Sequence, residues 1–214
     1  MTRSRSKALA LALAALVLGA CAGPSGEPAG GFLNRETESA YIPLSGTKYL
    51  FFKGDAAALA LGDGVAVTNA HTADLVKERQ VIGTSRDYDL MFFHTDKRVA
   101  PLAIGTPREG ARVVAYGQYD GGLRRAEGNV TSLDAPVKPK CESCAVQSAF
   151  TFEGNAGPGF SGGPVLDAAS GRLIGIVFGY NDNPNGGRTI YAYPMARVNA
   201  ELERIEDKLP VDPD

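Results

Sequence analysis

Short apolar runs separated by turn residues fill the chain from about residue 41 to residue 193. Runs of this length, bounded by Gly, Pro, Asn and Asp, predict β-strands rather than helices. The Gly62-Asp63-Gly64 sequence lies between two such runs and predicts a hairpin turn. The predicted strands cover residues 47–52, 56–61, 65–68, 89–94, 99–104, 112–116, 123–130, 145–152, 165–167, 173–178 and 188–193.

The pattern changes after Pro194, where apolar residues recur at intervals of three and four. This spacing predicts an amphipathic helix over residues 195–209. Many short strands followed by one helix indicate an all-β domain, either a sandwich or a pair of barrels, over residues 41–209. The apolar helical positions are Met195, Val198, Leu202, Ile205 and Leu209.

The first twenty residues have the pattern of an export signal. A basic segment over residues 2–7 precedes an unbroken apolar run over residues 8–18, which is too short for a permanent membrane span. We therefore interpret residues 1–20 as a signal peptide. Residues 21–40 are rich in Gly, Pro, Ser and Glu, which predicts a flexible tether before the domain.

The signal peptide ends in Leu18-Gly19-Ala20-Cys21, which resembles a bacterial lipobox. The resemblance implies cleavage before Cys21 and attachment of a diacylglycerol to its thiol. The protein would then be an exported lipoprotein of the cell envelope, held to the membrane at Cys21. The alternative is an ordinary cleaved signal peptide followed by an incidental cysteine.

Composition and charge narrow the range of partners. Of the 214 residues, 44% are hydrophobic and 21% are charged, an ordinary balance for a globular protein. The net charge is −2 and no basic stripe is present, so we expect no nucleic-acid partner.

Three cysteines are an odd number for an exported protein. If Cys21 carries lipid, Cys141 and Cys144 remain as a pair, and an exported compartment permits them to form a disulfide. A redox motif would require a βαβ context, and a zinc site would require further ligands that the sequence does not supply. We therefore favour a small structural disulfide on a loop.

The segment Gly157-Pro158-Gly159-Phe160-Ser161-Gly162-Gly163 has the composition of a nucleophile turn. Glycines allow a sharp turn that exposes the Ser161 hydroxyl and lets the backbone approach a substrate closely. The alternative is a Gly-rich turn with an exposed serine. The segment also fits the G-x-S-x-G elbow of α/β-hydrolases, but both His71 and His94 precede Ser161, which is the wrong chain order for that class.

Two further segments resemble trypsin-like serine peptidases. Val67-Thr68-Asn69-Ala70-His71 resembles the strand that ends at their catalytic histidine, and the Asp89-Leu90 step resembles the block that carries their catalytic acid. The resemblance implies that Ser161 is the nucleophile, His71 its base and Asp89 the group that orients His71. It also implies an oxyanion hole formed by the N–H groups of Gly159 and Ser161.

The resemblance covers residues 41–209 and extends to substrate binding. Residues 173–179 resemble the strand that pairs with the substrate backbone, so Val177, Phe178 and Gly179 are expected to form one wall of the primary specificity pocket. Asn155 and Ala156 fall where the family has the base of that pocket. Neither supplies a carboxylate, which favours substrates with a neutral, small or medium apolar residue before the cut.

Two features depart from the family pattern. Only 18 residues separate His71 from Asp89, a short interval that requires a clipped loop or a different acid. Phe160 stands where animal digestive members have an aspartate that binds a new N-terminus, so activation by that route is not expected. We expect Asp87 to be a turn residue and His94 a surface residue.

The sequence therefore predicts two antiparallel six-stranded β-barrels, over about residues 41–105 and 106–193, closed by the C-terminal helix. The predicted activity is serine endopeptidase hydrolysis of proteins or peptides, and no metal or cofactor is implied. The rival hypothesis is an envelope-anchored binding or scaffold protein that keeps this fold without turnover, because a fold alone does not give a function.

Overall fold

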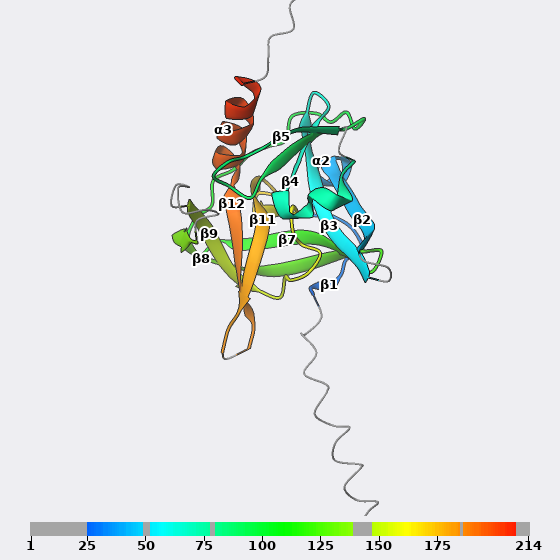
Figure 1. Ribbon diagram of the computed structural model, residues 1–214. Coiled ribbons are helices and arrows are strands. Elements are labelled where there is room, and N and C mark those ends of the chain that lie inside the picture. The colour runs from blue at the N-terminus through cyan, green and yellow to red at the C-terminus, as the bar shows by residue number, and fades with distance from the viewer. Residues whose placement is uncertain (1–24, 49–51, 78–79, 139–146, 185, 209–214) are drawn as a thin grey trace, which may run out of the picture.

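The computed structural model describes residues 25–48, 52–77, 80–138, 147–184 and 186–208 (Figure 1). Cys21, Cys141 and Cys144 lie outside the described residues, so the lipid anchor and the disulfide remain predictions. Among the described residues, no helix is both long and apolar enough to cross a lipid bilayer.

The N-terminal half of the domain is a five-stranded antiparallel sheet with the strand order β2-β3-β4-β6-β5. The turn between β3 and β4 contains Gly62, Asp63 and Gly64, all with positive φ, which confirms the predicted hairpin. The strands are β2 (Tyr41–Lys48), β3 (Phe52–Gly62), β4 (Val65–Thr68), β5 (Val81–Thr84) and β6 (Met91–His94).

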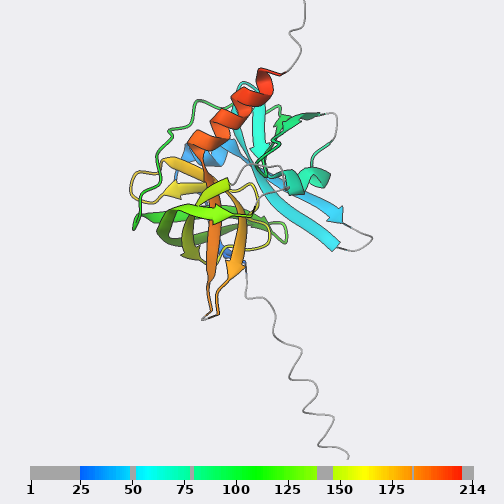
Figure 2. The same cartoon turned by 60° about the vertical axis from the view of Figure 1, so that its left-hand side comes forward.

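The C-terminal half is a seven-stranded sheet with the order β1-β8-β7-β10-β11-β12-β9. Strand β8 also pairs with β9, so the pairings of six of these strands run in a complete ring. The strands are β1 (Glu27–Pro28), β7 (Arg112–Tyr119), β8 (Gly122–Val137), β9 (Gln147–Gly154), β10 (Pro164–Asp167), β11 (Leu173–Asp182) and β12 (Arg188–Pro194). Figure 2 shows the two sheets beside each other, with the β11–β12 hairpin projecting from the body.

The mostly β fold with a C-terminal helix agrees with the sequence prediction, but two six-stranded barrels do not describe it. In the described part of the chain the first sheet has five strands, and its two edge strands, β2 and β5, do not pair with each other, so the sheet is not a closed barrel. The predicted strand over 99–104 is wrong, because Ile104 makes only an isolated bridge to Leu173. The predicted strand over 47–52 falls instead at the end of β2 and the start of β3, and β5 was not predicted.

Helix α3 (Met195–Glu206) covers the junction of the two sheets (Figures 1 and 2). Its buried Met195 and Val198 join a core cluster with residues of β3, β4, β6, β11 and β12. Because both sheets contribute to this cluster, the helix fixes them to each other, and with them the segments that lie between them.

The expected flexible tether over residues 21–40 is wrong for its described part, residues 25–40. This segment forms β1 and the short helix α2 (Arg35–Ala40), which Asn34 caps by accepting a hydrogen bond from Thr37 N at 2.8 Å. The Phe32 ring lies 4.9 Å from Tyr41 and 4.6 Å from Tyr116, between centroids. Glycine and proline content misled the prediction, because it does not show which few residues pack onto the domain.

Candidate active site

His71 lies directly after β4, in the 3-10 helix η2 (Ala70–Leu75). Beneath it, the buried Thr68 hydroxyl donates to the carbonyl of Ala57 at 2.7 Å, and Thr72 donates to the carbonyl of Asn69 at 2.7 Å. These bonds satisfy the buried hydroxyl groups of Thr68 and Thr72 where β4 ends and the chain turns, and the imidazole of His71 is presented at the surface.

Asp89 lies in the turn between β5 and β6 and contacts His71 twice. Asp89 Oδ2 lies 2.5 Å from His71 Nδ1, and Oδ1 accepts a hydrogen bond from the His71 backbone N–H at 3.0 Å. The Asp89 carbonyl also accepts a hydrogen bond from the Asn69 side chain at 3.0 Å. The short interval between His71 and Asp89 is therefore accommodated by a compact β5–β6 connection.

Ser161 lies in the connection between β9 and β10 of the second sheet, and its side chain meets that of His71 from the first half of the domain. Its Oγ is 2.9 Å from His71 Nε2. An ionised carboxylate only accepts hydrogen bonds, so the contact with Asp89 places the imidazole proton on Nδ1. Nε2 of the neutral ring is then the acceptor for the Ser161 hydroxyl, which is the geometry of a general base beside its nucleophile.

The turn before Ser161 has the conformation that its glycines predict. Gly159 has φ +90°, a conformation that L side chains rarely adopt. A Cβ added at Gly159 would lie 1.8 Å from the carbonyl oxygen of Gln118, so only glycine fits there. Among the described residues, the backbone N–H groups of Gly159 and Ser161 donate to no backbone carbonyl, so both can donate to a substrate oxygen.

Tyr193 of β12 is a site residue that the sequence analysis missed. Its hydroxyl accepts a hydrogen bond from the Asp89 backbone N–H at 3.3 Å and donates one to Gln147 Oε1 at 2.8 Å. Burial raises the pKa of Tyr193 above its ordinary value, so the hydroxyl stays protonated. No local sequence pattern marks this tyrosine, because its contacts come from segments distant in the chain.

Asp87 and His94, for which we expected a turn position and a surface position, do not join Ser161, His71 and Asp89. Asp87 is paired with Arg204 of α3, with its Oδ2 3.1 Å from Nη2 and 3.2 Å from Nη1. His94 is exposed at the end of β6, opposite Val65. Within the described part of the chain, neither side chain hydrogen-bonds to His71 or Ser161.

The expected substrate-binding residues separate into two groups. Val177 donates to Gly163 O and accepts from Gly162 N, both at 2.9 Å, so its backbone is occupied by the nucleophile segment. Ala156 is fully buried in the core of the second sheet. Phe178 and Gly179 are half-buried, and the Phe178 ring stacks on Tyr193 at 4.0 Å between centroids.

Asn155 is half-buried, and its backbone carbonyl accepts a hydrogen bond from Gly26 N at 2.9 Å. The guanidinium of Arg188 lies 3.4 Å from the same carbonyl and 3.5 Å from that of Ala156. Arg188 is itself buried and paired with Asp182 at 2.8 Å. The loop that was expected to form the pocket base is thus braced by a buried cation that the sequence analysis missed.

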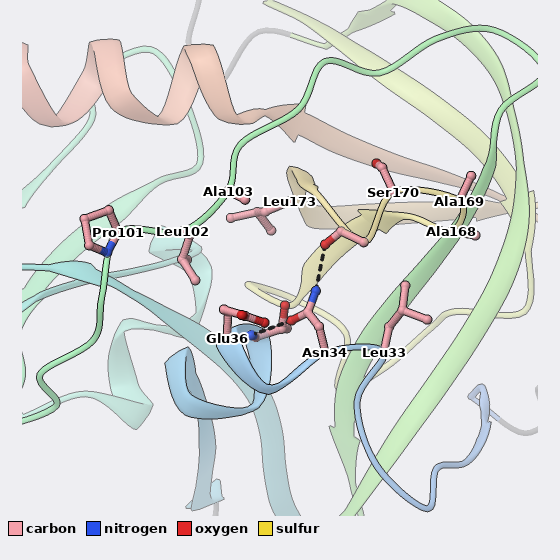
Figure 3. Close-up of a pocket in the computed structure, with 12 residues that line it drawn as sticks. Leu33, Asn34, Glu36, Pro101, Leu102, Ala103, Ala168, Ala169, Ser170 and Leu173 are labelled. Carbon is pink, nitrogen blue, oxygen red and sulfur yellow. Dashed lines mark hydrogen bonds between the residues drawn. The ribbon is translucent and has the colours of Figure 1, made fainter.

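A cavity of about 530 Å³ lies elsewhere, where the N-terminal segment meets the connection between the sheets (Figure 3). Its lining does not include Ser161, His71 or Asp89. It consists of Leu33, Asn34, Glu36, Thr37, residues 101–103, residues 168–171 and Leu173. Within it, Asn34 Nδ2 donates to the Gly171 carbonyl at 2.7 Å. This contact ties the N-terminal segment to the β10–β11 turn.

Comparison with known proteins identifies a family. The family model of the trypsin-like peptidase domain matches residues 54–176, more than half of the chain, including His71, Asp89 and Ser161. A search of curated protein sequences gives no match.

Several solved structures are similar in fold. The active form of the Rv3671c protease from M. tuberculosis has a TM-score of 0.66 and 17% identity, covering 88% of this chain and 92% of that one. The apo protease domain of MamO from Magnetospirillum magneticum has a TM-score of 0.57 and 20% identity, covering 77% of this chain and 96% of that one.

The HtrA-type protease AlgW, solved with a tripeptide, has a TM-score of 0.59 and 22% identity. The alignment covers 81% of this chain but only 61% of AlgW. At these identities, the likeness establishes the arrangement of the chain rather than its substrates.

Proposed function

This chain belongs to the family of trypsin-like peptidase domains and is a serine peptidase, and on that premise we propose that Ser161, His71 and Asp89 cut peptide bonds as a catalytic triad. One observation carries the proposal: the His71 imidazole contacts Asp89 through Nδ1 at 2.5 Å and Ser161 through Nε2 at 2.9 Å.

In the proposed reaction, Ser161 Oγ attacks the scissile carbonyl carbon while His71 Nε2 takes the hydroxyl proton. The carbonyl oxygen becomes an oxyanion and receives hydrogen bonds from the N–H groups of Gly159 and Ser161. His71 then gives its proton to the leaving amine as the C–N bond breaks. Water then attacks the acyl group while His71 takes its proton, and His71 returns that proton to Ser161 Oγ as the acyl group leaves.

Asp89 orients the histidine in this scheme. Its two oxygens bond to His71 Nδ1 and to the His71 backbone N–H, so both the ring and the chain that carries it are fixed. The carboxylate favours the tautomer in which Nε2 is free to accept a proton, and it stabilises the imidazolium that forms.

The proposed substrates are proteins or peptides with a neutral, small or medium apolar residue before the cut. The expected pocket base at Asn155 and Ala156 carries no carboxylate to pair with a lysine or arginine. The AlgW structures, which contain bound peptides, support peptide binding in this fold class. Cleavage of a peptide library would test this specificity, and a dominant preference for Arg or Lys would contradict it.

We also propose that the enzyme is an envelope lipoprotein anchored at Cys21. Because residues 25–40 pack on the domain, only residues 22–24 separate the proposed anchor from Ser25. Four extended residues reach about 14 Å. The anchor would therefore hold the domain close to the membrane surface rather than on a long tether.

Reaction with a fluorophosphonate probe tests the proposed chemistry. The purified mature protein should become covalently labelled at Ser161 and should hydrolyse a peptide pool, and Ser161→Ala should lose both while remaining folded. His71→Ala should lose nearly as much, because the two residues act as one unit. Folded wild type that neither labels nor cuts any peptide would support the scaffold hypothesis instead.

A further inference from the structure

Residues 157–160 form a turn whose type decides which way its central peptide faces. Phe160 N donates to Gly157 O at 3.1 Å, and Gly159 at the third position has φ +90°. This combination is the signature of a type II turn. The type I alternative would rotate the Pro158–Gly159 peptide by roughly half a turn and exchange the directions of its C=O and N–H groups.

The side chain of Ser25 binds the carbonyl group of the Pro158–Gly159 peptide. The Ser25 hydroxyl donates to the Pro158 carbonyl oxygen at 2.6 Å, although the two residues are 133 positions apart in the sequence. Ser25 is only 4% exposed whereas Pro158 is exposed, so the hydrogen bond is partly buried, with its donor on the buried side. In a trans peptide the N–H points opposite to the C=O, so the bond at Pro158 O also fixes the direction of the Gly159 N–H.

The segment that carries Ser25 is itself anchored on the second sheet. Gly26 N donates to Asn155 O at 2.9 Å, and Glu27 pairs with Arg125 at the edge of β8. Gly26 has φ +63°, and a Cβ there would lie 2.5 Å from the ring of the fully buried Phe160. The fit of Gly26 against Phe160 therefore sets the position of Ser25.

The oxyanion turn is held from its other side as well. Gln118 N donates to Gly159 O at 2.9 Å, and a Cβ at Gly157 would lie 2.4 Å from Arg188 Nη1 and 3.2 Å from Ser25 Oγ. The hydrogen bond from Gln118 restrains the peptide after the Pro158–Gly159 peptide, and the close packing of Gly157 leaves no room for a side chain before it. The hydrogen bond from Ser25 to the Pro158 carbonyl can form in only one of the two orientations of the Pro158–Gly159 peptide.

We propose that Ser25 is a positioning residue that holds the Gly159 N–H in the oxyanion hole. The effect of Ser25 on kcat rests on the proposed function, whereas its effect on the conformation of the turn does not. A hydrogen bond of ordinary net strength biases such an equilibrium by about threefold to tenfold. Loss of the Ser25 hydroxyl should lower kcat by about that factor and leave KM nearly unchanged, because the oxyanion forms only after substrate binds.

The test compares Ser25→Ala with Ser39→Ala, which removes an exposed hydroxyl from α2 in the same N-terminal segment. We expect Ser25→Ala to lower kcat by about threefold to tenfold. It should also weaken the binding of a peptidyl boronic acid by a similar factor, because the adduct of this inhibitor carries the negative charge of the oxyanion. The pH dependence of kcat/KM should keep its apparent pKa, because His71 and Asp89 are untouched. Ser39→Ala should match wild type in each measurement.

Amide hydrogen exchange of the resting protein supplies the second readout. Ser25→Ala should speed exchange within residues 157–161 selectively, with the urea midpoint close to that of wild type. Unchanged kcat and boronate affinity in Ser25→Ala would overturn the proposal. A variant in which KM rises while kcat and stability both fall would also overturn it. If wild type proves inactive, the triad proposal fails, and selective exchange alone then decides whether Ser25 holds the turn.

Discussion

The backbone N–H of Ala57 in β3 donates a hydrogen bond to the carbonyl oxygen of Ser161, 2.8 Å away. This bond joins the first sheet to the nucleophile segment of the second. It is possible because small residues line the contact: Ala56, Ala57 and Ala58 are fully buried, and Gly162 packs against Ala57. The alignment of Ser161 with His71 therefore depends on a close approach of two backbones.

Gly162→Ala should disrupt this contact. A Cβ at Gly162 would lie 2.0 Å from Ala57 O and 2.4 Å from Thr68 Oγ1, and the residue has φ +77°. We expect a stability loss of at least about 2 kcal/mol and loss of probe labelling. Urea denaturation would measure the first effect. Gly30→Ala, where the added Cβ meets nothing within 4 Å, is the control, and equal stability of the two variants would contradict the argument.

The sequence predicted Ser161, His71 and Asp89, the residues of the proposed triad, because each lies in a local sequence pattern. Glycines around Ser161 are required by positive φ at Gly159 and Gly162, and His71 follows a strand that is buried. Ser25 and Tyr193 were missed because their partners, Pro158 and Asp89, are far away in the chain. No periodicity or spacing encodes such a contact.

The errors in strand assignment also have a physical cause. The run over 99–104 is apolar because Val99 and Leu102 pack against the core cluster under α3, not because it pairs in a sheet. Burial by a connection and burial by a strand give the same residue types. Conversely, β5 covers only Val81–Thr84 and none of its residues is fully buried, so its apolar signal is weak.

Two buried tyrosines predict a loss of stability at alkaline pH. Burial raises the pKa of Tyr41 and of Tyr193 above that of a tyrosine in the unfolded chain, about 10. Between the unfolded and folded values the native state binds more protons, so stability is full below about pH 10 and falls as pH rises further. Urea unfolding at pH 8 and above pH 10 would measure the slope.

The double variant Tyr41→Phe/Tyr193→Phe should reduce that slope. At neutral pH, Tyr41→Phe alone should raise stability by about 1 kcal/mol, because the Tyr41 hydroxyl is buried without a hydrogen-bond partner among the described residues. Tyr193→Phe should instead lower it, because that hydroxyl bonds to Gln147 and Asp89. An unchanged alkaline slope in the double variant would assign the pH effect to other groups.

The proposed anchor predicts the behaviour of a Cys21 variant. Cys21→Ser removes the thiol that would carry the diacylglycerol, so the protein should leave the membrane fraction or accumulate as an unprocessed precursor. Metabolic labelling with a fatty acid should mark wild type and not the variant. Equal labelling of both proteins would contradict the lipobox interpretation.

Cys141 and Cys144 should be linked in protein purified from its export compartment without reductant. Mass spectrometry after alkylation would find the pair two hydrogens lighter than the free thiols. Reduction should cost little stability, because the closed loop is very short and the entropic effect of a cross-link grows with loop length. Recovery of both cysteines in the alkylated form would contradict the disulfide prediction.

Asp89→Asn and Asp87→Asn provide a matched test of the catalytic acid. Asparagine at position 89 can present an N–H to His71 Nδ1 and favour the wrong tautomer, so kcat should fall about 10⁴-fold with little effect on KM. Asp87→Asn breaks only the pair with partly exposed Arg204, so kcat should stay within about twofold and stability within about 1 kcal/mol of wild type. The reverse ranking, with Asp87→Asn inactive and Asp89→Asn active, would assign the orienting role to Asp87. Equal, near-wild-type rates in both variants would show that His71 works without a carboxylate from this turn.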